Sequence, residues 1–580
     1  MSLRRSPMRK YSYILLGFLA LLVVACGGGN TTTANDGGKA PENRQVLVQP
    51  MVGPGSLKTL DPPIAGGPRV VSMLYTGLVQ LDENLQVIDQ LAQTHEVASD
   101  GVTWTFKLKP NLKFSNGDPL TSEDVVYSID RALQPATKAP DALFYLRLIK
   151  DADKLATGKI KTLIGSSLLT PDPQTVKIIT SKKASHFLYA LAYETAFVVN
   201  KKVVEKYGSS YTHHIKEGAG AGPYILSEAD ENKAFVFVPN PNYNGPKPQI
   251  KKVIIPFYKS QDTMYQAYQT GEVSYTNVPP SQLEAAQKLP NNQFYKAAIQ
   301  GTTYYTMNYL IKPFDNQKVR QAFALALDKE QIARSVYKDT IIPTNHIVPQ
   351  GANSYNPNLK GPAGVNDLKG DKAKAKALFE EGLKEEGLSR DKLPPITLSI
   401  PQGDTLVQRE AVVVQQMWNE TLDLDVRVSV VETSKYYEDM DATKNNPHGM
   451  MIWRSYWKAD YADPQNWLTL LFDKESTFNN ENYGTNNASN KAEQQKAIDL
   501  MYTADANFNQ DERIKQYQEA EQMVVDHAAW IPLFQMTKVQ VRKPCVKGMI
   551  NSAPFDPAPD NWSKIYISND QPCISSRYTV

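Results

Sequence analysis

The chain has 580 residues, of which 41% are hydrophobic and 21% charged, and its formal net charge is +2. This composition is typical of a large globular protein with more than one lobe, and it excludes collagen-like, disulfide-scaffold and wholly disordered proteins. A mean hydropathy of −0.42 and a single long apolar run exclude a protein that crosses a membrane many times.

The first 25 residues have the order of a secretory signal. Four basic residues between positions 4 and 10 precede an apolar run of about 15 residues, which is shorter than the roughly 20 residues of a spanning helix. The run ends in Val23-Val24-Ala25-Cys26, which resembles the lipobox of bacterial lipoproteins. This resemblance implies cleavage before Cys26 and acyl chains on the new N-terminus, which would hold the protein to the outside of a membrane. An uncleaved anchor with a chance cysteine is the alternative.

Removal of the signal changes how the charge is interpreted. Residues 1–25 contain four basic and no acidic residues, so their loss turns the net charge of +2 into −2. A chain with this charge has no basic surface for nucleic acid. The next stretch is rich in Gly, Thr and Asn, and we assign residues 26–43 to a flexible tether.

The first clear pattern after the tether is a strand, a pair of turns and a helix. Residues 104–109 alternate apolar and polar side chains, as in a half-buried strand. Turns follow at Pro110-Asn111 and Asn116-Gly117. Thr121 has the position of a helix N-cap, followed by acids and by apolar residues at helical spacing, namely Val125, Ile129 and Ala132.

Later segments mix strand and helix patterns. Residues 236–238 and 253–255 are short apolar runs that predict buried strands, and apolar residues at helical spacing occur near residues 319–326 and 514–524. No fixed repeat separates them. The order predicts a mixed α/β protein with two or three lobes.

A search for catalytic chemistry finds no pattern that supports an enzyme. The seven histidines form no metal-binding motif, and no nucleophile elbow or phosphate loop occurs. The glycine-rich stretch 218–224 lacks the lysine of a phosphate loop, and we interpret it as a tight turn that opens a strand. We therefore expect no metal and no cofactor. Cys545 and Cys573 lie 28 residues apart and could either form one disulfide or stay free.

The aromatic content is more informative. The chain has 30 Tyr against 18 Phe, and tyrosine suits clefts that enclose a partly polar ligand. Residues 453–467 hold three Trp, two Tyr, an arginine, a lysine and two aspartates. A buried core strand would not carry so many charges, so we interpret this aromatic and charged segment as a ligand-contacting one.

Short motifs along the chain resemble the extracellular solute-binding family 5, the dipeptide and oligopeptide receptors of ABC importers. The resemblance runs from about residue 44 to 550 and rests on many pieces in family order. Among them are Tyr75-Thr76-Gly77-Leu78, Phe114-Ser115-Asn116-Gly117-Asp118-Pro119-Leu120-Thr121, Asn240-Pro241-Asn242-Tyr243, Pro313-Phe314-Asp315-Asn316 and Ala459-Asp460-Tyr461-Ala462-Asp463-Pro464. The stretch 131–159 is more similar to the oligopeptide branch than to the nickel or dipeptide branch.

The resemblance implies a periplasmic-binding-protein fold with two lobes that close by a hinge around the ligand. It divides the chain into three domains. Domain I takes residues 44–83, 198–300 and 536–580, domain II takes 84–197, and domain III takes 301–535.

The resemblance also implies roles for residues of the segment 453–467. Asp460 matches the family's aspartate for a peptide's α-ammonium, and Trp457 matches a tryptophan that lines a side-chain pocket. Tyr456, Trp457 and Lys458 would offer a strand edge through their backbone, to which an extended peptide could pair. Arg454 matches an arginine near the carboxylate of short peptides. The side chain of Lys458 carries no family role, and Asp463 with Pro464 is expected to form a structural turn.

The implied function is the substrate-binding component of an ABC importer. It would capture oligopeptides through their main chain and termini, and deliver them to the permease subunits as a lipid-anchored monomer on the periplasmic or cell-surface side. A receptor of the same fold for an oligosaccharide, an opine or a metal chelate is the alternative. An exported enzyme on this fold is the third class, and it is disfavoured because no catalytic group of residues is visible.

Overall fold

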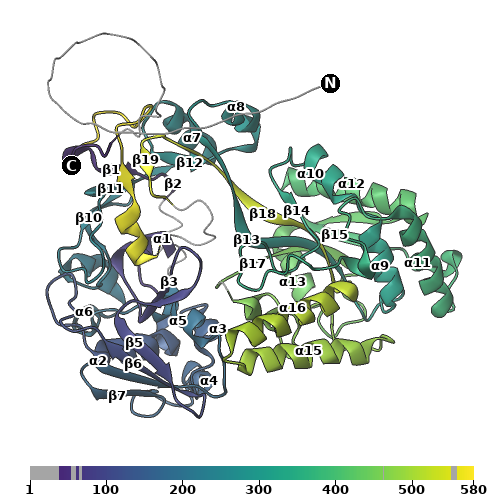
Figure 1. Cartoon of the computed structure of the whole chain (residues 1–580), viewed down its shortest axis with the longest axis horizontal. Helices are drawn as coiled ribbons and strands as arrows, with labels where there is room; N and C mark the ends of the chain where they lie inside the picture. Colours follow the sequence, from purple (N-terminus) through teal and green to yellow (C-terminus); the bar gives the residue numbers. More distant parts are fainter. Residues whose placement is uncertain (1–37, 54–59, 65–67, 462, 550–557) are drawn as a thin grey trace, which may run out of the picture.

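The computed structural model describes residues 38–53, 60–64, 68–461, 463–549 and 558–580. The predicted signal peptide, Cys26 and most of the predicted tether lie outside these described residues. Within them, no helix is both long enough and apolar enough to cross a membrane. The chain forms two lobes joined by two long strands, β13 (Phe294–Met307) and β18 (Trp530–Arg542) (Figure 1).

The first lobe contains two larger sheets and two short ribbons. One sheet has the order β1-β11-β10-β9, with β2 also paired to β11, and the other has the order β5-β6-β8-β7. The strands of the first sheet are β1 (Val46–Val48), β2 (Met51–Val52), β9 (Tyr224–Asp230), β10 (Ala234–Pro239) and β11 (Lys252–Tyr258). Those of the second are β5 (Ala92–Val97), β6 (Thr103–Leu108), β7 (Leu168–Asp172) and β8 (Thr175–Ile179). The ribbons pair β3 (Val79–Leu81) with β4 (Val87–Asp89), and β19 (Val546–Lys547) with β20 (Tyr566–Ile567).

Eight helices accompany the described part of these sheets. They are α1 (Pro68–Leu74), α2 (Ser122–Leu133), α3 (Ala142–Leu146), α4 (Ala152–Ala156), α5 (Phe187–Leu191), α6 (Lys201–Tyr207), α7 (Gln261–Gln269) and α8 (Leu283–Gln287). Each sheet has its own core. Trp104 and Phe106 of β6 pack with Phe187 in one cluster, while Phe237 of β10 and Trp562 belong to another.

The second lobe is built around the largest sheet, whose order is β12-β18-β13-β17-β15-β16, with β14 also paired to β18. Its further strands are β12 (Tyr275–Asn277), β14 (Ile342–Pro343), β15 (Thr397–Pro401), β16 (Arg427–Val431) and β17 (Ile452–Lys458). The helices are α9 (Gln317–Leu325), α10 (Lys329–Ser335), α11 (Lys372–Glu385), α12 (Thr405–Leu422), α13 (Thr433–Asp441), α14 (Thr469–Phe472), α15 (Lys491–Ala506) and α16 (Gln510–Asp526).

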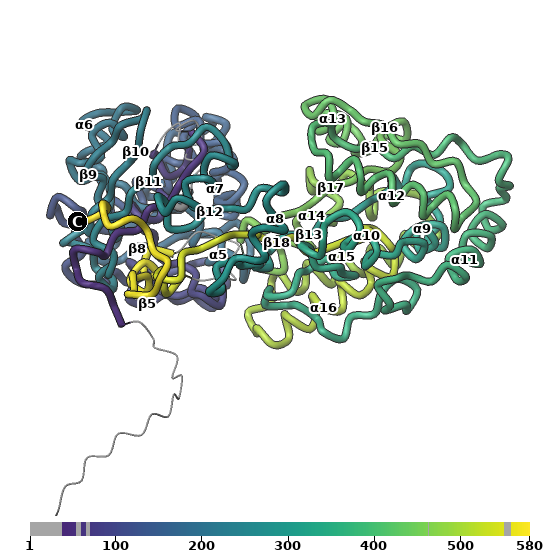
Figure 2. The backbone as a smooth tube through the Cα atoms, turned by 90° about the horizontal axis from the view of Figure 1, so that it is seen from above, coloured from purple at the N-terminus to yellow at the C-terminus, as the bar shows by residue number. Residues whose placement is uncertain are grey.

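The two long strands connect the lobes. The first half of β13 pairs with Thr537–Val541 of β18, and its second half pairs with Trp530–Gln535. The register shifts between Ala298 and Thr302, where a bulge bends the strand. At the first-lobe end, β18 pairs with β12, and Figure 2 shows this pair of strands spanning the gap between the lobes.

The local predictions agree with the structure. The alternating segment 104–109 is β6 with a one-residue difference in bounds, and the predicted strands near 236 and 253 are β10 and β11. Thr121 is the N-cap of α2, where its backbone N–H donates to the carboxylate of Asp124 over 2.9 Å. The two later helical patterns correspond to α9 and α16.

The glycine-rich stretch 218–224 is a tight turn before β9. The backbone N–H of Gly222 donates to the Leu74 carbonyl over 2.9 Å, and a Cβ at Gly222 would come within 2.5 Å of that carbonyl carbon. A side chain would therefore separate α1 from β9. The stretch serves packing.

Cys545 and Cys573 form a disulfide in the structure. It links the segment before β19 to the C-terminal segment, beside the first-lobe core that includes Cys545. The pair closes a loop of 28 residues.

Candidate functional site

The aromatic and charged segment 453–467 begins on β17. This strand pairs with β13 along its whole length, from Ile452 opposite Met307 to Lys458 opposite Gly301. Its other edge pairs with β15 only at Ile452 and Trp453. Within the described chain, no strand covers that edge from Ser455 to Lys458. An extended ligand can therefore add to the sheet there.

Asp460 lies just beyond the end of this open edge. Its backbone N–H donates to Asn466 Oδ1 over 3.2 Å, and Asn466 Nδ2 donates to the carboxylate over 3.4 Å. The hydroxyl of Tyr145, from α3 of the other lobe, also hydrogen-bonds the carboxylate. Burial raises the pKa of Asp460, and the hydrogen bonds from Tyr145 and Asn466 oppose that shift.

The Asp460 carboxylate has no cation against it. Among the described residues it takes part in no salt bridge, although Lys458 lowers its pKa through a longer-range charge interaction. A half-buried carboxylate with only neutral hydrogen-bond donors gains most from a cationic ligand group. The site is therefore suited to an ammonium.

Aromatic rings from both lobes surround this carboxylate. Trp457 is half-buried, its Nε1 donates to Asn466 Oδ1 over 2.9 Å, and its ring lies 5.1 Å from that of Phe478. Across the lobes, Phe478 contacts Phe144 at 5.7 Å between centroids. Tyr145 stacks on Tyr193 at 3.8 Å. These rings form an apolar wall beside the carboxylate.

Tyr456 and Lys458 lie on the opposite face of β17 from Trp457, because successive side chains of a strand alternate. Both are exposed, Tyr456 at 47%. Their backbone, rather than their side chains, belongs to the open edge. The structure thus brings Asp460 and Trp457 together and directs the side chains of Tyr456 and Lys458 away from them.

Arg454 is engaged in the core of the second lobe. Its Nε donates to Glu410 Oε1 over 2.9 Å, and Glu410 of α12 is fully buried. The same carboxylate accepts hydrogen bonds from the hydroxyls of Tyr305, at 2.6 Å, and Tyr337. Burial by itself would lower the pKa of Arg454, but the neighbouring Glu410 raises it overall. A role of Arg454 toward a ligand carboxylate stays a prediction.

Asp463 has the structural role expected from the sequence. Its carboxylate accepts from the backbone of Gln465 over 2.9 Å and from Arg513 over 2.6 Å, and both charged side chains are buried. Asp463 therefore differs from Asp460, whose carboxylate has no such cation.

Three residues at this site were not found by sequence reasoning: Phe144, Tyr193 and Phe478. They come from segments far from residues 453–467 along the chain, so composition around that segment gives no signal for them. Asn466 lies within the segment, and its amide could have been predicted to support Asp460 from its spacing. Elsewhere in the described residues, no group of three or more His, Cys, Asp or Glu is placed to hold a metal ion.

Comparison with known proteins places these features in a family context. A model of the bacterial extracellular solute-binding proteins, family 5, matches residues 86–479. The oligopeptide-binding protein OppA of Bacillus subtilis is 27% identical over 555 residues, covering 93% of this chain and 97% of its own. A probable deoxycholate-binding periplasmic protein, YgiS of Escherichia coli, is 27% identical and covers 84% of this chain and 87% of its own.

Two solved structures show the same fold. The murein tripeptide binding protein MppA in its unliganded open form superposes with a TM-score of 0.77 at 26% identity, covering 92% of this chain and 99% of its own. A second structure, that of Escherichia coli MppA, gives a TM-score of 0.66 at 25% identity and covers 90% and 99%. The arrangement of the two lobes is thus more similar to the open form.

Proposed function

The chain belongs to family 5 of the bacterial extracellular solute-binding proteins, which bind solutes and are not enzymes, and from this premise we propose that it captures oligopeptides for an ABC importer. Peptides bind in the cleft between the lobes, and the closed receptor delivers them to the permease subunits. The receptor is a monomer, held to the outer side of a membrane by a lipid on Cys26.

One observation carries the proposal. Asp460 is a half-buried carboxylate without a cation, and it stands at the end of a strand edge that is open over Ser455–Lys458. A peptide presents an ammonium at the start of an extended backbone, so both features match one ligand. The aromatic ring of Trp457 supplies a wall for a side chain.

The three-domain division is part of the proposal. The boundaries at 300/301 and 535/536 fall at the bulge where β13 and β18 shift register, between Ala298 and Thr302. This is where the chain passes between the lobes. Residues 84–197 contain the β5-β6-β8-β7 sheet with its own hydrophobic cluster, which supports a separate domain II.

A non-peptide solute is the second candidate. It is favoured by the relative named as a probable deoxycholate-binding protein, and by the aromatic rings around the site, which suit any apolar ligand. A steroid carboxylate would bring a negative charge to Asp460, which disfavours this class. Mass spectrometry of solutes that co-purify with the full chain separates the two candidates.

Blocking the peptide's N-terminus should weaken binding tenfold or more. An N-acetyl group removes the ammonium, so the Asp460 carboxylate is buried without the charge partner that offsets its loss of water. We expect titration calorimetry to show this difference between tetra-alanine and N-acetyl-tetra-alanine. Amidation of the C-terminus is the matched control, and it should have the smaller effect. Equal binding of the free and acetylated peptides would show that the ligand belongs to another class.

Peptide affinity should also fall on acidification, and it should begin to do so at a higher pH than for an ordinary aspartate. Burial raises the pKa of Asp460 in the free protein, and only the ionised carboxylate pairs with the ammonium. Affinity therefore rises as the pH increases through that raised pKa, and falls again above about pH 8, where an α-amino group loses its proton. Calorimetry of tetra-alanine across pH 4–9 measures this, and affinity that stays constant below pH 7 contradicts it.

A further inference from the structure

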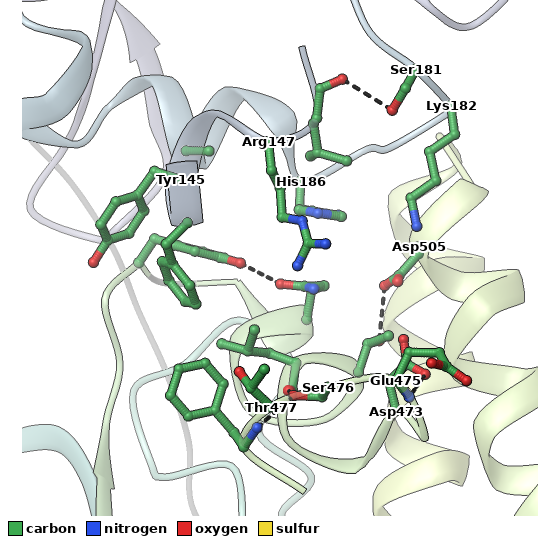
Figure 3. Close-up of a pocket in the computed structure, with 18 of the residues that line it drawn as sticks. Tyr145, Arg147, Ser181, Lys182, His186, Asp473, Glu475, Ser476, Thr477 and Asp505 are labelled. Atoms are coloured by element: carbon green, nitrogen blue, oxygen red, sulfur yellow. Dashed lines mark hydrogen bonds between the residues drawn. The ribbon is translucent and has the colours of Figure 1, made fainter. Parts of the chain in front are cut away.

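A pocket of about 500 Å³ lies between the lobes, beside the proposed peptide site (Figure 3). Tyr145 and Tyr461 line it, whereas Asp460 and Trp457 do not. The tyrosine rings therefore separate the pocket from the carboxylate. Residues between 144 and 190 form one wall and residues between 461 and 505 form the other, so each lobe supplies one side.

The two walls carry opposite charges. Arg147, directly after α3, and Lys182, between β8 and α5, extend from the first lobe, while Asp473 and Glu475 lie on the loop after α14 of the second lobe (Figure 3). None of the four forms an ion pair with another described residue. Asp473 accepts only from the hydroxyl of Tyr502 over 2.6 Å and from the backbone of Glu475 over 3.0 Å.

The other charged residues of the pocket are already accounted for or lie on the same side as the cations. Asp505 is buried, and its carboxylate accepts hydrogen bonds from Thr469 over 3.0 Å and from Tyr517. Asp153 lies on the first-lobe wall beside Arg147 and Lys182. The unpaired charges that face each other from different lobes are thus the two cations and the two acids.

The lobes already meet beside this pocket through neutral hydrogen bonds. The backbone N–H and the hydroxyl of Ser185 donate to the Asp505 carbonyl over 2.9 and 3.1 Å. Asn353 Nδ2 donates to the Tyr189 hydroxyl over 2.9 Å. The pocket thus lies at a contact between lobes whose relative arrangement is closer to an open form, with TM-scores of 0.77 and 0.66 against the two MppA structures. A rotation of the lobes changes the width of such a pocket.

We propose that Arg147 and Lys182 pair with Asp473 and Glu475 when the lobes rotate together, so that these four residues form an electrostatic latch that holds the closed state. The latch lies across the cleft from the strands β13 and β18 that connect the lobes (Figure 1). It rests on the proposed function only for the ligand that drives closure. A latch of this kind strengthens binding of every ligand, because it stabilises the closed state and touches no ligand atom.

Charge reversal tests the latch. In the full chain, Arg147→Glu with Lys182→Glu should weaken tetra-alanine binding about three- to tenfold at low salt, as expected for two partly exposed ion pairs. Adding Asp473→Lys and Glu475→Lys to that variant should restore most of the affinity. The wild type should lose a similar factor in 1 M salt, where the Debye length is about 3 Å. Lys159→Glu with Lys161→Glu, two exposed cations of the same lobe outside the pocket, is the matched control and should change little.

A second measurement separates this proposal from the proposed function. Small-angle X-ray scattering of the ligand-free chain reports the separation of the lobes whether or not peptides bind. We expect the radius of gyration to rise with salt in the wild type and to be raised already at low salt in the reversed variant, but not in the control. An unchanged radius in the reversed variant, or failure of the four-residue swap to restore the wild-type radius, overturns the latch. Absence of tetra-alanine binding with the expected scattering overturns the proposed ligand alone.

Discussion

Replacing Asp460 with alanine is expected to weaken peptide binding tenfold or more while leaving the melting temperature nearly unchanged. The carboxylate is half-buried, has no cation among the described residues, and receives only neutral hydrogen bonds from Tyr145 and Asn466. A peptide ammonium in a closed cleft would complete this pair. Removing one partner of a buried pair costs about 3–5 kcal/mol, and 1.4 kcal/mol is already tenfold in affinity.

The expected stability follows from the sign of the pKa shift. Because the folded state raises the pKa of Asp460, its protonated form is favoured by folding. The stabilising contribution is present below the unfolded value near 3.8 and is lost as the pH rises through the raised folded pKa. At neutral pH the ionised side chain therefore does not stabilise the ligand-free protein, and its removal should not lower the melting temperature.

Two further variants make this test specific. Asp460→Asn keeps the size and the hydrogen-bonding capacity of the side chain, so a loss as large as that of Asp460→Ala assigns the effect to charge. Asp425→Asn changes the net charge equally at an exposed position before β16, and it should bind as the wild type does. Calorimetry that finds full affinity in Asp460→Ala would remove Asp460 from the site.

Local structure was predictable where short-range patterns dominate. The alternation in residues 104–109 predicts β6 because one face of that strand packs on the core while the other is wet. Thr121 could be identified as an N-cap from the acids and apolar spacing that follow it. Such signals depend on neighbours within a few residues, so the sequence alone carries them.

The connection between the lobes could not be predicted in this way. β13 spans fourteen residues, and its partner β18 starts more than 220 residues later. Its two halves pair with different parts of β18, with a register shift between them. Strand pairing over this separation depends on tertiary packing, which local propensity does not encode. The family resemblance, rather than the pattern, is what led to an expected boundary near residue 300.

The candidate site divides in the same way. Asp460 and Trp457 lie seven residues or fewer from Arg454 and could be predicted together from composition and resemblance. Phe144 and Tyr193, which complete the aromatic wall, lie on the other lobe. Glu410 is also distant in sequence, and its burial beside Arg454 is invisible until the fold of the second lobe is known. The environment of Arg454 is therefore the part of the site for which sequence reasoning was least informative.

Replacing Arg454 with methionine should destabilise the second lobe by about 3–5 kcal/mol, since it leaves the fully buried Glu410 carboxylate without its cation. The hydroxyls of Tyr305 and Tyr337 remain as donors, but neither supplies a positive charge. Thermal and chemical unfolding of the full chain measure the loss. Arg427→Met is the matched control, because Arg427 pairs with Asp425 at the surface, where an ion pair contributes at most about 1 kcal/mol.

A double variant distinguishes a structural role of Arg454 from a ligand-binding one. Arg454→Met with Glu410→Gln removes both charges, and the amide oxygen still accepts from the two tyrosines, so most of the stability should return. If Arg454 acts through Glu410 alone, this variant should also bind tetra-alanine within a few-fold of the wild type at temperatures below unfolding. If stability returns while affinity stays low, Arg454 contacts the ligand, and the carboxylate-binding role implied by the family resemblance holds. The outcome thus decides whether the guanidinium serves the core of the second lobe or the far end of the peptide.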